Sequence, residues 1–157
     1  MATTLVGTSG HPPDPTTTTW RWFVADAYIP PSSTGSEVSH ESICVLNRAA
    51  VASTFTITAY FADREPEQSR LITIAARRDL HLRTDMPDRI GGLTIERGVP
   101  YGLEIESETD LQVQYSRLDT SQAAYALMTA MLTAAPALPN TADQATGQAQ
   151  DHKPINA

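Results

Sequence analysis

Arginines next to carboxylates are the residues of this chain best suited to chemistry. Residues 63–65 read Asp-Arg-Glu, residues 117–119 read Arg-Leu-Asp, and residues 77–78 form an arginine pair, each at the end of a strand-like run or in a turn. A planar guanidinium binds a carboxylate through two parallel hydrogen bonds, which fixes loops and subunit contacts. The same donors would serve a polar ligand. Two interpretations stay open, a structural ion-pair network and a ligand pocket.

A ligand pocket for a sugar would need an aromatic surface as well as forked donors and acceptors. The C–H face of a sugar packs on a ring while its hydroxyls meet polar groups, and a few convergent polar groups are enough. We therefore predict a polar set in which arginines donate, carboxylates accept, a tryptophan stacks and histidines do either. Its members are Trp22, Asp26, His40, Glu41, Arg77, Arg78, His81, Arg117 and Asp119.

The motifs of common catalytic and cofactor sites are missing from the sequence. There is no Gly-rich phosphate loop and no Gly-x-Ser-x-Gly elbow. Residues 39–41 read Ser-His-Glu, but neighbours in a strand point to opposite faces and cannot act as a triad. His40 and His81 lack the spacing of metal ligands. We predict no enzyme, metal or cofactor; a sugar-acting hydrolase or isomerase using Glu41 and His40 is the open alternative.

Composition and net charge limit the classes of partner and the cellular location that we expect. The chain has 157 residues and a net charge of -7, from 18 acids and 11 basic residues. Such a charge repels nucleic acid and anionic membranes, so DNA binding is not favoured. The single cysteine, Cys44, excludes an internal disulfide and is expected to be a thiol buried in a strand. No apolar run approaches the ~20 residues of a membrane helix, and the N-terminus lacks signal-peptide features. We expect a cytoplasmic protein.

Short β-patterned runs follow one another at about ten-residue spacing through the middle of the chain. Alternation is clearest in residues 54–61 and 103–107, where one face is apolar and the other carries threonines or glutamates. Many short strands predict an all-β sandwich or barrel. Residues 122–133 are the exception, because their alanine stripe favours a helix, although threonines and Pro136 also allow a strand. The other runs lie near 22–28, 42–46, 71–75, 80–83 and 111–115.

The two ends of the chain differ in composition from the middle. Residues 1–19 are rich in proline and glycine and include four consecutive threonines, and residues 136–157 have almost no large apolar side chain. Such segments cannot bury enough apolar surface to offset the entropy of ordering. We predict a disordered arm, one ordered domain over residues 20–135, and a disordered tail. The loop at residues 85–98 cannot be assigned beyond a turn at Gly91-Gly92.

Six segments, in order, resemble the sensory rhodopsin transducer family, and the resemblance covers about residues 20–134. Residues 26–27 depart from its pattern, because Asp-Ala stands where the family usually has Glu-Gly before Tyr-Ile-Pro. Aspartate keeps the carboxylate, and the Cβ of Ala27 argues against a positive φ there. The matching segments are Trp22-x-x-Ala25-Asp26-x-Tyr28-Ile29-Pro30-Pro31, Ser39-His40-Glu41, Cys44-Val45-Leu46-Asn47, Asp63-Arg64-Glu65-Pro66, Ala76-Arg77-Arg78-x-x-His81-x-Arg83 and Gln114-Tyr115-Ser116-Arg117-Leu118-Asp119-Thr120.

The resemblance implies a single-domain, jelly-roll-like β-sandwich that forms a homotetramer in the cytoplasm. It turns the expectation for residues 125–133 from a helix to a final strand. The type member of the family is a soluble partner of a microbial sensory rhodopsin, and many relatives resemble general small-molecule-binding domains for sugars or related metabolites. Our leading hypothesis is a non-enzymatic small-molecule-binding protein that acts in signalling. The alternative is a soluble transducer that binds a rhodopsin directly.

Overall fold

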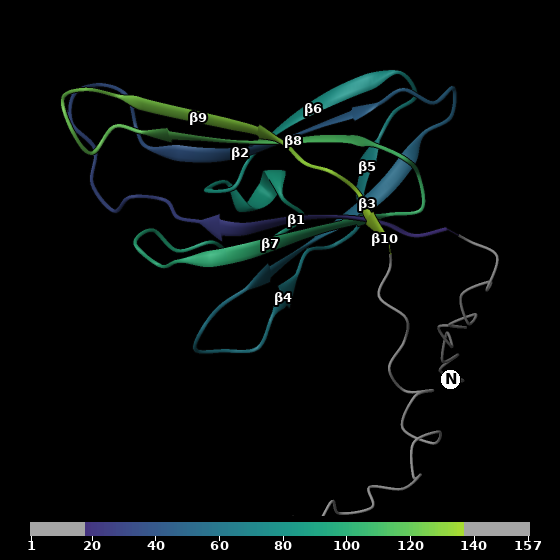
Figure 1. Ribbon diagram of the computed structural model, residues 1–157, viewed down its shortest axis with the longest axis horizontal. Coiled ribbons are helices and arrows are strands. Elements are labelled where there is room, and N and C mark those ends of the chain that lie inside the picture. The colour runs from purple at the N-terminus through teal and green to yellow at the C-terminus, as the bar shows by residue number, and fades with distance from the viewer. Residues whose placement is uncertain (1–17, 137–157) are drawn as a thin grey trace, which may run out of the picture.

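Two antiparallel sheets packed face to face make up the protein, as the computed structural model shows for residues 18–136 (Figure 1). The larger sheet, called sheet A, has the order β10-β1-β7-β3-β4, with β5 also paired to β3. Sheet B has the order β6-β2-β8-β9. The strands are β1 (Trp20–Ala27), β2 (His40–Asn47), β3 (Ser53–Tyr60), β4 (Glu67–Gln68), β5 (Ile72–Ile74), β6 (Arg78–Arg83), β7 (Tyr101–Ser107), β8 (Gln112–Asp119), β9 (Ala126–Met131) and β10 (Ala135–Pro136).

Alternation along each strand builds the core between the sheets. Phe55, Ile57 and Ala59 of β3 are buried, and so are Leu103 and Ile105 of β7. Their neighbours in the sequence face outward, because successive side chains of a strand point to opposite faces. The predicted β-sandwich is confirmed, as are the predicted inward faces of these strands. The predicted arm and tail lie outside the described residues, except that Thr18, Thr19 and Pro136 are described and Pro136 belongs to β10.

Residues 126–131 form the edge strand β9, so the helix favoured by the alanine pattern is wrong and the strand implied by the family resemblance is confirmed. All of β9 pairs with β8, from Gln114 opposite Met131 to Asp119 opposite Ala126. Alanine favours helix by less than about 1 kcal/mol per residue. Hydrogen bonding to the open edge of sheet B outweighs that preference, since a stripe of alanines offers a helix little apolar surface to bury.

The segment that the sequence left unassigned enters the core. It contains one 3-10 turn, η1 (Pro87–Arg89), and then buries Ile90, Leu93 and Ile95. The predicted turn is confirmed, because Gly91 has φ +66°, a conformation that favours glycine. A Cβ at Gly91 would also lie 2.6 Å from a backbone oxygen. The apolar residues here follow neither the period of a helix nor that of a strand, so no pattern predicts an element in this segment.

The predictions for the backbone of Ala27 and for the burial of Cys44 have different outcomes. Ala27 is buried and is not among the described residues with positive φ, as its Cβ led us to expect. Cys44 is half-buried on the outer face of sheet B, not enclosed in the core, because only alternate residues of β2 point inward. No helix in the described part of the chain is long and apolar enough to cross a membrane.

Candidate functional site

A fully buried carboxylate, that of Glu41, lies at the centre of a polar cluster between the sheets. The backbone N–H of Tyr28 donates to Glu41 Oε1 at 2.7 Å, and Arg117 Nε donates to the same oxygen at 2.8 Å. The hydroxyls of Tyr101 and Tyr115 also donate to this carboxylate. Charge-assisted bonds of this kind are the strong ones. They satisfy Glu41, whose burial would otherwise be very costly.

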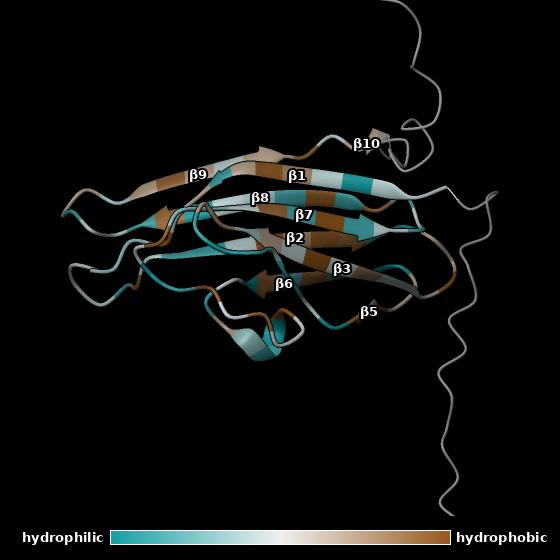
Figure 2. Cartoon of the chain, turned by 90° about the horizontal axis from the view of Figure 1, so that it is seen from below, coloured by the Kyte–Doolittle hydropathy of each residue, from teal (hydrophilic) through white to brown (hydrophobic). Residues whose placement is uncertain are grey.

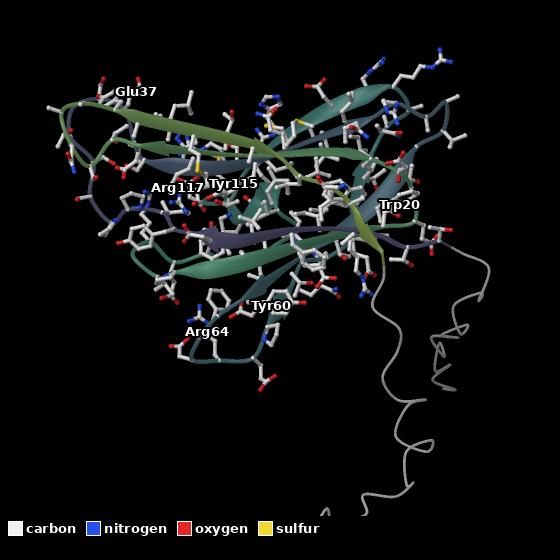
Figure 3. All side chains as sticks on the ribbon, viewed as in Figure 1. Trp20, Glu37, Tyr60, Arg64, Tyr115 and Arg117 are labelled. Atoms are coloured by element: carbon white, nitrogen blue, oxygen red, sulfur yellow. The ribbon has the colours of Figure 1, made fainter. Side chains whose placement is uncertain are left out.

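Strand register explains how these residues meet. Glu41 on β2 stands opposite Arg117 on β8, so both side chains lie on the inward face of sheet B. Tyr101 reaches the same carboxylate from β7 of sheet A, so the cluster ties the two sheets together. Figure 3 shows Tyr115 and Arg117 between the layers. Burial, together with the charge of Glu41, raises the pKa of both tyrosine hydroxyls, which keeps them as donors.

The cluster opens to solvent at one end. Arg117 Nη2 donates to the backbone oxygen of Asp26 at 3.1 Å and lies 4.0 Å from its carboxylate, whose side chain is 88% exposed. Burial lowers the pKa of Arg117, but its hydrogen bonds to Glu41 and Tyr115 outweigh that effect and the net shift is upward. Of the predicted polar set, therefore, Asp26, Glu41 and Arg117 come together. Their arrangement is an ion-pair network.

A second group forms on the outer face of sheet B. His40 and Ser42 point outward from β2, where Ser42 stands opposite Arg83 of β6 and Cys44 stands opposite His81. His40, Ser42, His81 and Arg83 line a surface pocket of about 430 Å³. The pocket brings together the two predicted histidines, which lie far apart in the sequence. Its lining is His40, Ser42, His81, Arg83, Met86 and Arg89.

Hydrogen bonds fix several of these side chains. His40 Nδ1 lies 2.8 Å from the carbonyl oxygen of Val38, to which it donates. His81 Nδ1 lies 3.6 Å from Cys44 Sγ, and its Nε2 lies 3.7 Å from an oxygen of Asp79. Burial, followed by the charge of Asp79, raises the pKa of the Cys44 thiol, so this cysteine is not an activated nucleophile.

One carboxylate links the pocket to the rest of the molecule. Asp85 accepts from Arg83 Nε at 2.9 Å and Nη2 at 2.8 Å, and from Arg97 Nη2 at 2.6 Å. Arg97 Nη1 also donates to the backbone oxygen of Ser39 at 2.8 Å. Burial opposes ionisation of Asp85, but its hydrogen bonds to Arg83 and the positive charges of Arg83 and Arg97 lower its pKa. The bridge runs from the pocket to the connection between β1 and β2.

The remaining predicted residues stand apart, so the expectation of one shared cavity is wrong. Trp22 is 1% exposed and packs in the core, where its ring cannot stack on a ligand. Arg77 and Arg78 are exposed where β6 begins, and Arg78 Nη1 donates to the Arg77 backbone oxygen at 2.9 Å. Asp119 accepts from the backbone N–H of Ser121. Strand alternation also divides the predicted set between two faces of sheet B, because it points His40 outward and Glu41 inward.

Two of the sequence patterns have structural outcomes: the Ser-His-Glu neighbours point to different faces, as predicted, and Arg64, whose role the sequence left open, forms ion pairs. Ser39 and Glu41 are buried while His40 faces outward, so these three neighbours form no triad. Arg64 pairs with Asp63 at 3.5 Å and with Glu67 at 3.3 Å. Its guanidinium also covers the Phe61 ring, 3.6 Å from the centroid. Arg64 therefore follows the ion-pair interpretation, with Glu67 and not its neighbour Glu65 as the second partner.

Several residues of both groups were missed by the sequence reasoning. Tyr101 begins the inward-facing series that continues with Leu103, and this alternation was a usable signal. Arg89 and Arg97 lie in the segment without periodicity, where no pattern indicates which side chains meet. Within residues 18–136, no three His, Cys, Asp or Glu side chains lie close enough to hold a metal ion.

Comparison with known proteins identifies the family to which the chain belongs. The profile of the family described as "Anabaena sensory rhodopsin transducer" matches residues 17–134. A solved structure described as "Thermotoga maritima 1070" is 35% identical, with a TM-score of 0.64, covering 73% of this chain and 92% of that one. The solved "Anabaena sensory rhodopsin transducer" is also 35% identical, with a TM-score of 0.55, covering 66% of this chain and 91% of that one. No curated protein sequence gives a significant match. By sequence and fold, this chain belongs to the Anabaena sensory rhodopsin transducer family.

Proposed function

We propose that this protein is a non-enzymatic, cytoplasmic binding protein that holds a small polar ligand, such as a sugar-like metabolite, and passes its occupancy on in signalling. The observation that carries the proposal is the surface pocket between β2 and β6. It gathers both predicted histidines with two arginines and a serine. Arginine offers several hydrogen-bond donors in a fork, whereas histidine and serine offer single donors. Together they suit the recognition of hydroxyl-rich or charged metabolites.

The buried environment of the Glu41 carboxylate supports a binding role for the protein and not a catalytic one. Glu41, the residue that an acid–base mechanism would need, is buried and receives four donors. A general base must reach the proton it removes within about 3 Å or through one water. His40 lies on the other face of the strand from Glu41. The pair therefore lacks the shared approach to a substrate that a sugar-acting enzyme requires.

The signalling half of the proposal rests on the Asp85 bridge. A ligand that engages Arg83 competes with Asp85 for the same guanidinium. Asp85 also holds Arg97, whose other nitrogen holds the backbone just before β2. Ligand binding would thus weaken the hold of Asp85 and Arg97 on the β1–β2 connection, and a ligand shifts a conformation only through such a difference in contacts.

Isothermal titration against a panel of sugars and metabolites tests the proposal. We expect at least one compound to bind at millimolar concentration or tighter, and binding to fall on His81→Gln. Arg78→Gln, at the far end of the same strand and outside the pocket, is the matched control. No binding across the panel at millimolar ligand would contradict the proposal, as would turnover of a panel compound that is lost on Glu41→Gln.

A homotetramer is the assembly we propose. β9 is an edge strand, so one side of its backbone is unpaired by the sheet. Its Leu127 and Met131 are 70% and 63% exposed, and β9 is tinted hydrophobic along one edge of the molecule (Figure 2). Exposed apolar edges invite pairing, and a second copy is the partner always present. Sedimentation should show a tetramer that Leu127→Lys weakens; a 17.0 kDa wild-type species would contradict this.

Direct binding of a microbial sensory rhodopsin is the second candidate function. The observation favouring it is the 35% identity to the solved Anabaena sensory rhodopsin transducer over 91% of that chain. A rhodopsin gene adjacent to the gene for this protein, followed by co-purification of the two products from detergent, would support it. A genome without any rhodopsin gene would exclude it.

A further inference from the structure

We infer that the pocket between β2 and β6 binds an oxyanion, meaning the carboxylate or phosphate group of its ligand, and binds it more tightly as the histidines protonate. The inference rests on the proposed binding function of this pocket and specifies its ligand class. A sugar acid and a sugar phosphate share the required chemistry, namely negative oxygens that accept from several nitrogen donors.

Charge is the first support. All four ionisable residues that line the pocket are bases, namely His40, His81, Arg83 and Arg89. No carboxylate lines it, although the chain as a whole carries a net charge of -7. By contrast, the pocket beside β3 and β7 on the other sheet is lined by Glu106 and Glu108. A positive site on an acidic protein selects anions locally.

Available donors are the second support. Asp85 pairs with Arg83 and with Arg97, and within residues 18–136 Arg89 has no such ion pair. The bidentate contact with Asp85 uses Nε and Nη2 of Arg83, which holds the guanidinium plane at the pocket. Arg89 stands in η1, directly after Asp88. An incoming oxyanion thus finds one arginine free of a carboxylate and a second arginine already oriented.

The tautomer of His40 supplies the pH dependence. Because a carbonyl oxygen only accepts, the contact with Val38 places a proton on Nδ1 of His40. In the neutral ring Nε2 is then an acceptor, which repels an oxyanion, and protonation turns it into a donor. The charged groups around the two rings are Arg83 and Arg89 in the lining, Asp85 near His40, and Asp79 beside His81. The Cys44 thiol is the other titratable neighbour of His81.

Titration with matched probes at pH 5.5 and pH 8.0 tests the inference. The probes are glucose, glucuronate, glucose 6-phosphate and sulfate, of which sulfate does not titrate in this range. We expect glucuronate or glucose 6-phosphate to bind about tenfold or more tightly than glucose, as one charge-assisted contact provides. Comparing the two sugar anions identifies carboxylate or phosphate as the preferred group. Sulfate should bind severalfold more tightly at pH 5.5.

Variants locate the site. Arg89→Gln should weaken anion binding about tenfold, since it removes one charged donor from the surface without touching the core. His40→Gln should reduce the pH dependence of anion binding, and Arg78→Gln, with the same charge change as Arg89→Gln but outside the pocket, should leave both the affinity and the pH dependence unchanged. Equal binding of glucose and glucuronate would overturn the inference while leaving the proposed function standing. Equal effects of Arg89→Gln and Arg78→Gln would overturn it too, and no binding of any probe would contradict both.

Discussion

Replacing the buried carboxylate, Glu41→Gln, is the sharpest test of how the sandwich is held together. Glutamine keeps the size and shape of glutamate, so the change opens no cavity. It removes the negative charge that receives donors from both sheets and from the segment after β1. It also leaves the guanidinium of Arg117 without its ionic partner at 2.8 Å.

The expected cost follows from this geometry. Removing one member of a fully buried ion pair costs about 3–5 kcal/mol, and Arg117, which is partly exposed and lies 4.0 Å from the Asp26 carboxylate, keeps part of its compensation. The two tyrosine hydroxyls can rotate and keep part of their bonding, which places the expected loss near the lower end of that range. Against a total stability of about 5–15 kcal/mol for a domain, this is a large fraction. For a domain of this size it corresponds to a melting temperature lower by about 10–20 °C.

Thermal and urea unfolding followed by circular dichroism would measure the loss. Glu106→Gln is the matched control, because Glu106 is 38% exposed and pairs with Arg21 on the outer face of sheet A. A surface pair of this kind contributes about 1 kcal/mol at most. Equal losses in the two variants would refute the idea that Glu41 ties the sheets. If Glu41→Gln does not fold, Tyr101→Phe, which removes a single donor, should still cost about 1.5–3 kcal/mol.

Three further predictions concern pH and backbone conformation. The pKa of Asp85 is lowered in the folded protein, so the ionised carboxylate contributes its full share of folding stability above the ordinary aspartate pKa of about 4. This stability is lost as pH falls through the lowered pKa. In Asp85→Asn, the free energy of unfolding should therefore depend less on pH in that window. The hydrogen bond to Glu104 raises the pKa of Tyr60 to about 12. The protonated hydroxyl therefore contributes its full share of folding stability below the unfolded-state pKa of about 10, and this share disappears as pH rises through 12. In Tyr60→Phe, the free energy of unfolding should not show this decrease between pH 10 and about 12. Gly91→Ala should melt well below Gly98→Ala, because both residues have positive φ but only at Gly91 would the added Cβ lie 2.6 Å from a backbone oxygen.

Much of the sandwich follows from local rules. In β3 and β7 every second residue is apolar, and a strand with that period has only one way to present a continuous apolar face. The turn at Gly91 was likewise readable, because adjacent glycines tolerate a positive φ that other residues avoid. The predicted facing of His40 away from Glu41 follows from the same alternation, and it held.

Other features depended on which strands become neighbours. Residues 126–131 carry a helical pattern, yet the free edge of β8 made them a strand, and no local signal reports that edge. The predicted cavity failed for a related reason. Residue types indicated which side chains suit a ligand, but two faces of one sheet divide them, with Glu41 and Arg117 inside and His40 and His81 outside.

The sequence alone determined the β class, the inward faces of the strands and the family, because these depend on residue types and short spacings. Only the tertiary structure decided that Arg83 and Arg89 join the two histidines and that Tyr101 reaches Glu41 across the core. Such contacts link residues many positions apart. They depend on strand order and register, which are set by the packing of the whole domain and have no counterpart in any local pattern.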